Sequence, residues 1–155
     1  MVRRFSVGGV AGVVLAAALA LSGCSRGGSV ELANAYIPMP STPGVTVAYL
    51  QIRNNGSADE LLGVHTSIGG TVSLRAPVTR GTQVTAMRNV SEIPVPADST
   101  VRLDPNSYHL LITGANALRS GKAITLTLTF AHAGNMSVIA LVTDPASGGS
   151  SYFLN

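Results

Sequence analysis

Met87 and His109 are the two side chains of this chain whose types and placement together suggest chemistry. Both fall near the ends of segments that are predicted to be strands, and 21 residues separate them. A thioether and an imidazole suit Cu(I), because this soft d10 ion favours sulfur and tolerates nitrogen. Each residue also has a structural interpretation, since methionine often fills gaps in a core and a histidine at a strand end often makes structural hydrogen bonds. The pair therefore supports a copper-site hypothesis, with the structural alternative left open.

The other histidines and methionines form no second constellation. His65 has no neighbour in the sequence that suggests a site, and His132 lies in a segment typical of a turn. Met39, in a loop after the first predicted strand, is either a substitute ligand or a loop hydrophobe, and Met136 is expected in the core. The carboxylates are scattered, and no Gly-rich phosphate loop precedes a helix. The sequence does not predict an enzyme.

The single cysteine, Cys24, is predicted to carry a lipid. It closes the tetrapeptide Leu-Ser-Gly-Cys after an apolar stretch over residues 7–21, and Arg3 and Arg4 supply a basic start. This order resembles the bacterial lipobox, in which a secretory signal is cut just before the modified cysteine. The alternative is a cysteine buried in a membrane helix, but the Gly- and Ala-rich stretch is short of the roughly 20 strongly apolar residues that a span requires.

The lipobox resemblance implies a protein held at the membrane by lipid. Residues 1–23 would be the signal peptide, and diacylglycerol on Cys24 would anchor the chain to the extracytoplasmic face of the cell membrane. The mature protein would then have no free thiol, so any soft-metal site must use Met or His. Removing Arg3 and Arg4 from the ten Lys and Arg residues leaves eight, against seven Asp and Glu. This balance excludes the clustered cations of a nucleic-acid interface, and no nucleic acid is expected as a partner.

Alternating patterns predict strands as the elements that must position these residues. The segment 124–130 alternates apolar residues with threonine without exception, which indicates one buried and one wet face. The segment 45–53 also alternates, with Val47 and Tyr49 on one face and Ala48 and Leu50 on the other, and it stops at an Asn-Asn-Gly turn signal. Shorter strands are expected over 31–37, 61–66, 70–76, 83–88, 100–103, 108–113 and 136–141.

The strand pattern predicts an all-β domain. About eight or nine short strands in some 115 residues indicate an antiparallel sandwich or Greek-key barrel. Residues 30–144 would form this single domain, 24–29 a flexible tether and 145–155 a flexible tail.

The same region resembles a known family over nearly all of residues 30–142. The features that carry the likeness are the Met-X21-His spacing, the Pro-Val-Pro-Ala-Asp turn at 94–98, the approach to His109 over 103–109, the 118–122 loop and the 126–130 strand. Together they resemble the periplasmic copper chaperone PCu(A)C family, of which this chain would be a divergent member. The resemblance implies a cupredoxin-like Greek-key barrel. It also implies passage of Cu(I) toward the copper site of cytochrome c oxidase.

The family's ligand pattern, His-X10-Met-X21-His-X-Met, is half present. Met87 and His109 match its two middle positions. The first histidine would fall at or beside position 76, where the chain has Arg75 and Ala76, and the last methionine would fall at Leu111. The resemblance thus implies a membrane-anchored copper-binding, chaperone-like protein whose partner is a cytochrome oxidase copper subunit or another copper protein. The alternative is a metal-free lipoprotein of the same fold that acts as an interaction or scaffolding module.

Overall fold

Ten β-strands form the part of the chain that the computed structural model describes, residues 29–116 and 118–144. The predictions for the signal peptide, Cys24 and the tail lie outside these residues. The described part contains no helix of the length and apolarity that a membrane span requires. The strands are β1 (Val30–Pro38), β2 (Gly44–Asn54), β3 (Asp59–Thr66), β4 (Thr71–Arg80), β5 (Gln83–Val90), β6 (Ile93–Val95), β7 (Ser99–Leu103), β8 (His109–Ala115), β9 (Ala123–Phe130) and β10 (Gly134–Thr143).

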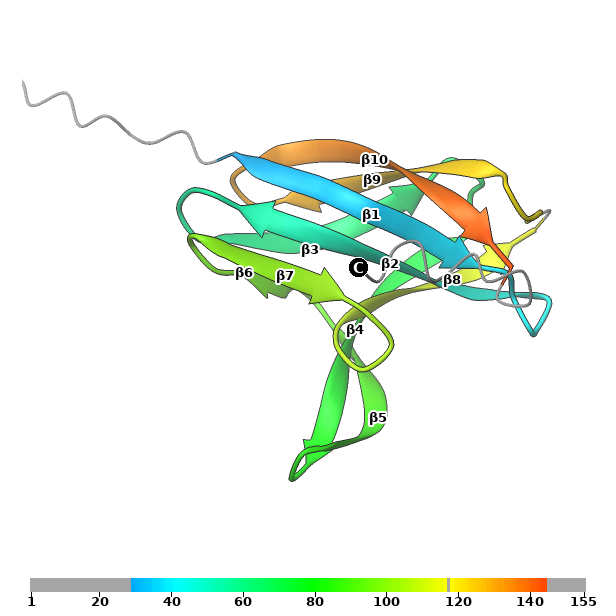
Figure 1. Cartoon of the computed structure of the whole chain (residues 1–155), viewed down its shortest axis with the longest axis horizontal. Coiled ribbons are helices and arrows are strands. Elements are labelled where there is room, and N and C mark those ends of the chain that lie inside the picture. Colours follow the sequence, from blue (N-terminus) through cyan, green and yellow to red (C-terminus); the bar gives the residue numbers. More distant parts are fainter. Residues whose placement is uncertain (1–28, 117, 145–155) are drawn as a thin grey trace, which may run out of the picture.

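The strands hydrogen-bond in the order β5-β4-β8-β2-β1-β10-β9-β3-β6, and β7 pairs with β2 outside this path. Strand β2 connects two layers, because its first half pairs with β8 and its second half pairs with β7. The curled sheet places β1, β9 and β10 across the core from β8 and β4 (Figure 1). The expected all-β, cupredoxin-like architecture is confirmed.

The strand count and one pairing differ from the expectation. The nine expected strands are all present. The tenth strand, β6, overlaps the start of the segment 94–98, which the sequence predicts to be a turn because of its prolines. Strand β1 pairs with β10 in parallel, through Tyr36 and Leu141, whereas the sequence predicts only antiparallel strands. Pairing between the first and last strands depends on contacts that no local pattern encodes.

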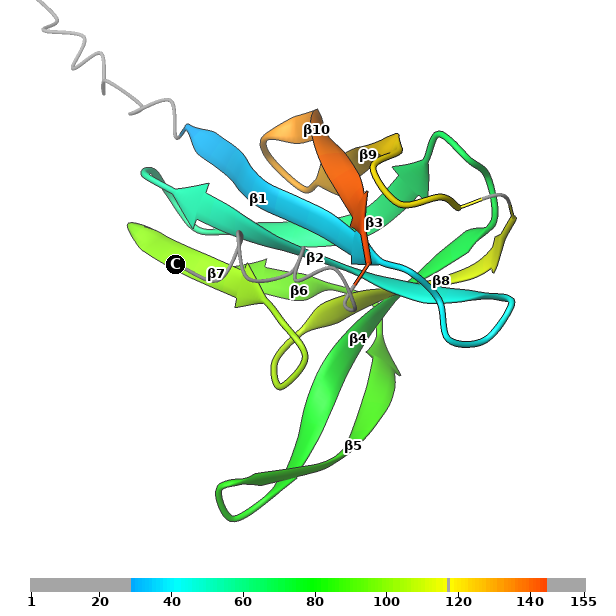
Figure 2. The ribbon, with the colours of Figure 1, turned by 45° about the vertical axis from the view of Figure 1, so that its right-hand side comes forward.

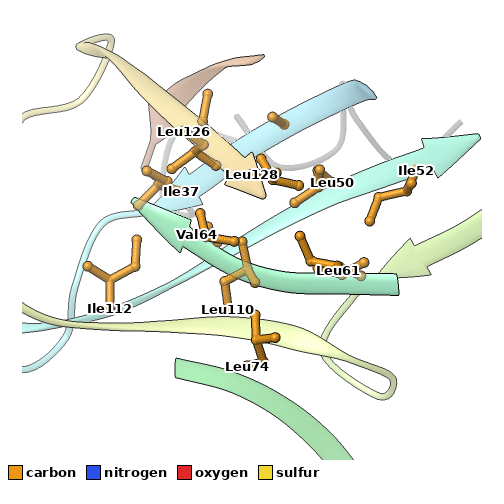
Figure 3. Packing of buried hydrophobic residues seen from close by; sticks show 14 of the residues in the cluster. Ile37, Leu50, Ile52, Leu61, Val64, Leu74, Leu110, Ile112, Leu126 and Leu128 are labelled. Atoms are coloured by element: carbon orange, nitrogen blue, oxygen red, sulfur yellow. The ribbon is translucent and has the colours of Figure 1, made fainter. Parts of the chain in front are cut away.

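The core lies between the two layers and is built from the inward faces of nearly every strand (Figure 3). Strand β9 follows the predicted alternation, since Ile124, Leu126 and Leu128 have no exposed surface while its threonines face outward. Burying each such side chain contributes about 1.5–3 kcal/mol. In β2 the inward residues are Ala48, Leu50 and Ile52, and Tyr49 is on the outward face. The alternation in the sequence alone does not decide which of the two faces is buried.

Strands β4 and β5 form a hairpin that extends away from the rest of the fold in both views (Figures 1 and 2). Its turn is the two-residue segment between the Arg80–Gln83 pair, where Gly81 has a φ of 62°. Glycine is the residue that accepts such a positive φ without a steric penalty. Strand β5 pairs only with β4, and the hairpin carries Met87 to the edge of the sheet.

Candidate metal centre

Strand register places Met87 and His109 on one face of the sheet, with β4 between them. Arg75 on β4 is directly opposite His109 on β8 and opposite Asn89 on β5. Two residues along, Pro77 is opposite Met87. Residues that face each other across an antiparallel pair, and residues two apart on one strand, point to the same side. Arg75, Met87 and His109 therefore share the face that is turned away from the core.

His109 is the most buried polar member of this face, with 9% of its surface exposed. Its Nδ1 atom is buried and has no hydrogen-bond partner. The ring of Tyr49 meets the imidazole edge-on, with 6.2 Å between the ring centroids, and Tyr36 packs on Tyr49 at 5.1 Å. The two tyrosines therefore pack on one side of the imidazole.

The electrostatic surroundings of His109 favour a neutral imidazole. Burial is the largest influence and lowers its pKa, and the positive charge of Arg75 lowers it further. The backbone of Ser107 and the carboxylate of Asp104 act in the opposite direction, although Nδ1 makes no hydrogen bond of good geometry. Because the pKa lies below the usual value, the ring keeps a free lone pair at neutral pH, as a metal ligand must.

Met87 is partly buried on β5 and does not belong to the hydrophobic core or to the side chains packed against it. The core-filling interpretation of Met87 is therefore wrong. It does hold for Met39 and Met136, which both pack against the core. The packing thus agrees with the expectation that Met136 lies in the core, and it separates Met87 from both of these methionines.

Arg75 occupies the middle of the candidate site and is held there by two hydrogen bonds. Its Nη1 donates to Oδ1 of Asn89 at 2.6 Å, and its Nη2 donates to the backbone carbonyl of Met87 at 2.9 Å. Its Nε is buried without a hydrogen-bond partner. Within the described residues the single ion pair joins His132 to Asp59, so no carboxylate there forms an ion pair with Arg75. The site carries a fixed positive charge.

The two remaining ligand positions of the resembled pattern supply no donor atom. Ala76 is 4% exposed and lies on the opposite face from His109, so Arg75 is the residue that occupies the first position. Leu111, two residues after His109 on the same face, is partly exposed. No group of three or more His, Cys, Asp or Glu side chains in the described segments could hold a metal ion. The donors on this face are the Met87 thioether and the His109 imidazole.

The other two histidines lie elsewhere. His65 is exposed on β3, opposite Thr127 of β9. His132 lies in the β9–β10 turn, as its sequence context predicts, and its backbone amide donates to Asp59 at 2.9 Å. The sequence did not identify Tyr36 and Tyr49 as neighbours of His109, because only the register of β1, β2 and β8 brings them there. Asp104 approaches His109 locally, from the loop between β7 and β8, where its amide donates to the carbonyl of Tyr108 at 2.9 Å.

Comparisons with known proteins place the chain in the LpqE-like family. The sequence profile of the family described as "Putative lipoprotein LpqE-like" matches residues 30–142. A curated relative, "Putative lipoprotein Lxx21020" of Leifsonia xyli subsp. xyli, is 26% identical over 153 residues, which cover 90% of this chain and 92% of the relative.

Solved structures of PCuAC domains share the fold. The copper-bound PCuAC domain from PmoF2 superposes with a TM-score of 0.62 at 19% identity, covering 75% of this chain and 93% of that domain. The apo PCuAC domain from PmoF1 gives 0.63 at 19% identity, covering 75% and 94%. The Cu(I) form of DR1885 from Deinococcus radiodurans gives 0.59 at 23% identity, covering 72% and 76%. The likeness to PCuAC domains that the sequence predicts is thus confirmed for the fold.

Proposed function

Because this chain belongs to the LpqE-like family of lipoproteins, we propose that it is anchored to the cell membrane through lipid on Cys24 and binds Cu(I) on its extracytoplasmic side. Met87 and His109 are the ligands. The observation that carries this proposal is the state of these two side chains. A neutral, nine-tenths buried imidazole with an unpartnered Nδ1 and a thioether outside the core lie on one face of the sheet.

The arrangement suits receipt and release of copper better than permanent storage. Two neutral protein ligands leave coordination positions of Cu(I) open to an incoming donor, so the ion can pass to another protein by ligand exchange. The recipient in this proposal is the copper subunit of a cytochrome oxidase or another copper protein. Copper-bound relatives of the same fold, the PmoF2 domain and DR1885, support copper as the cargo.

A titration of the purified protein with Cu(I) against a competing chromophoric chelator tests the copper proposal. We expect binding in the nanomolar range or tighter, weakened at least about tenfold by Met87→Ala or His109→Ala, since each removes one of two ligands. His65→Ala serves as the matched control, because His65 is an exposed strand residue away from this face. Absence of nanomolar binding, or equal binding by all four proteins, overturns the proposal.

The lipid anchor has its own test. Mass spectrometry of the membrane-extracted protein should show a chain that begins at Cys24 and carries diacylglycerol, whereas Cys24→Ser should give a chain without this added mass that is not cut before position 24. A wild-type chain without diacylglycerol, or one that does not begin at Cys24, would refute the anchor.

A second candidate function, a metal-free interaction module, is favoured by Arg75. This cation and Leu111 replace two ligands of the resembled pattern, and the β4–β5 hairpin beside them exposes Val78 and Val84 by 38% and 37%. Such apolar side chains on a projecting edge suit contact with another protein. The Cu(I) titration separates the two functions, because a metal-free module shows no binding that depends on Met87 and His109.

A further inference from the structure

We infer that the candidate site takes Cu(I) together with a thiolate from outside the chain, and that Arg75 is the residue that selects this anionic donor. The inference rests on the proposed copper function and deepens it. It names the chemical class of the third ligand, which the chain itself does not supply.

The first step is that Arg75 cannot easily leave the site. Its two terminal nitrogens are tied to Asn89 and to the Met87 carbonyl, both on the strand that carries the thioether ligand. Its backbone is directly opposite His109, the other ligand. Arg75 therefore bridges the two ligand-bearing strands, and its charge stays close to any ion that both ligands hold.

The second step concerns the balance of charge. The thioether of Met87 and the imidazole of His109 are neutral, so Cu(I) bound by them adds a positive charge beside a guanidinium that makes no ion pair within the described residues. The Asp104 carboxylate acts on His109 through space and offsets part of this charge, but its influence on the His109 pKa is smaller than that of Arg75. Two like charges at a partly buried site repel each other strongly. A neutral third ligand leaves this repulsion in place, whereas a ligand with one negative charge offsets it.

The third step identifies the anion. Among common biological anions the thiolate is the donor that soft Cu(I) prefers. The chain contains a single cysteine, Cys24, which is expected to be consumed by lipid, so the thiolate must come from a small thiol or from a cysteine of a partner protein. On binding, the thiol gives its proton to water and a sulfur–copper bond forms, with copper remaining Cu(I) throughout.

A matched pair of small ligands tests the inference on the purified full-length lipoprotein. Affinity for Cu(I) is measured with 2-mercaptoethanol and, separately, with its S-methyl ether, which has the same body but cannot become an anion. We expect the thiol to tighten Cu(I) binding about tenfold or more and the thioether to have little effect. Equal effects of the two ligands would overturn the inference.

Removing the charge of Arg75 should abolish the thiol dependence of Cu(I) binding. Arg75→Gln is expected to bind Cu(I) alone more tightly than the wild type, because the repulsion is gone, and to lose the added benefit of the thiol. Arg75→Lys, which keeps the charge, should keep the benefit. Arg88→Gln is the matched control, since Arg88 lies on the same strand as Met87 but on its opposite face, paired with Ala76. An Arg75→Gln protein with the thiol dependence of the wild type refutes the role of Arg75.

Two further readouts keep the outcomes apart. X-ray absorption of the loaded protein should count more sulfur ligands per copper with the thiol present than without it, and this increase should be smaller in Arg75→Gln. The source of the thiolate is tested with a blocked Gly-Cys-Gly peptide at the same thiolate concentration as 2-mercaptoethanol. A larger gain in Cu(I) affinity with the peptide assigns the donor to a protein, and an equal gain assigns it to a small thiol. If Cu(I) binding does not depend on Met87 or His109, the proposed function fails. If binding depends on both residues but Arg75→Gln keeps the thiol benefit of the wild type, only this inference is refuted.

Discussion

Asp59 offers the sharpest test of how the fold is held together. This carboxylate at the start of β3 is 6% exposed and ties that strand to the β9–β10 turn. Its Oδ1 accepts from the backbone amides of Glu60 at 2.8 Å and His132 at 2.9 Å, and its Oδ2 accepts from the amide of Ala133 at 2.8 Å. Nδ1 of His132 lies 3.3 Å from Oδ1. Asp59→Ala removes both long-range bonds at once.

The expected cost follows from these contacts. A hydrogen bond to a charged acceptor contributes about 1.5–3 kcal/mol. The Glu60 bond is local, so the amides of His132 and Ala133 carry the long-range tie, and water can reach this turn because the His132 side chain is 77% exposed. We therefore take the lower end and expect Asp59→Ala to lower the free energy of unfolding by about 3 kcal/mol at pH 7. Asp59→Asn keeps one acceptor oxygen and should lose about half as much.

The loss should also depend on pH with a definite sign. Burial alone would raise the pKa of Asp59, but the hydrogen bonds from Glu60, His132 and Ala133 outweigh it and hold the pKa below its usual value. The carboxylate therefore stabilises the fold above the unfolded-state pKa of about 4, and this stability is lost as pH falls through the lower folded-state pKa.

Urea unfolding of the wild type and the Asp59→Ala and Asp59→Asn variants at several pH values measures both effects. The difference between wild type and Asp59→Ala should be largest near pH 7 and shrink in acid. Glu60→Gln is the control, because the neighbouring Glu60 carboxylate is exposed, and its effect should stay within about 0.5 kcal/mol. A difference that is small at pH 7, or that grows in acid, would refute the reasoning.

Three other predictions concern buried or strained positions. The Asn54 amide is 1% exposed and its Nδ2 donates to three backbone carbonyls, so Asn54→Asp should cost about 3 kcal/mol or more in urea unfolding, whereas a cost under 1 kcal/mol would contradict this geometry. The pKa of His109, followed by NMR without metal, should lie below its usual value and rise in Arg75→Gln, because Arg75 lowers it; no rise would argue against their proximity. Gly70→Ala puts a Cβ 2.5 Å from a backbone oxygen and should lower the melting temperature clearly more than Gly69→Ala, which has a similar φ but open space; equal losses would show that strain alone matters.

Local patterns in the sequence predicted most of the fold. The strict alternation over 124–130 indicated the faces of β9 because each threonine falls between two apolar residues, and the structure buries the apolar set completely. The Asn-Asn-Gly signal marked the end of β2, where the Asn54 side chain accepts from the amide of Gly56 at 2.9 Å. The short β6 was missed because Pro94 within it and Pro96 just after it are typical of a turn, and the parallel β1–β10 pair was missed because it joins strands from opposite ends of the domain.

The candidate site was predicted in part. The sequence by itself determined that Met87 and His109 are the soft donors to consider and that a ligand of the resembled pattern is missing at or beside position 76. Only the tertiary structure decided that Arg75 lies on the ligand face while Ala76 turns inward, and that Met87 is free of the core. The physical reason is the two-residue period of a strand, in which a register shift of one residue moves every side chain to the opposite face. The β4–β5 pairing is a local hairpin, but the pairing of β4 with β8, which sets Arg75 opposite His109, joins segments too far apart along the chain for a local pattern to predict.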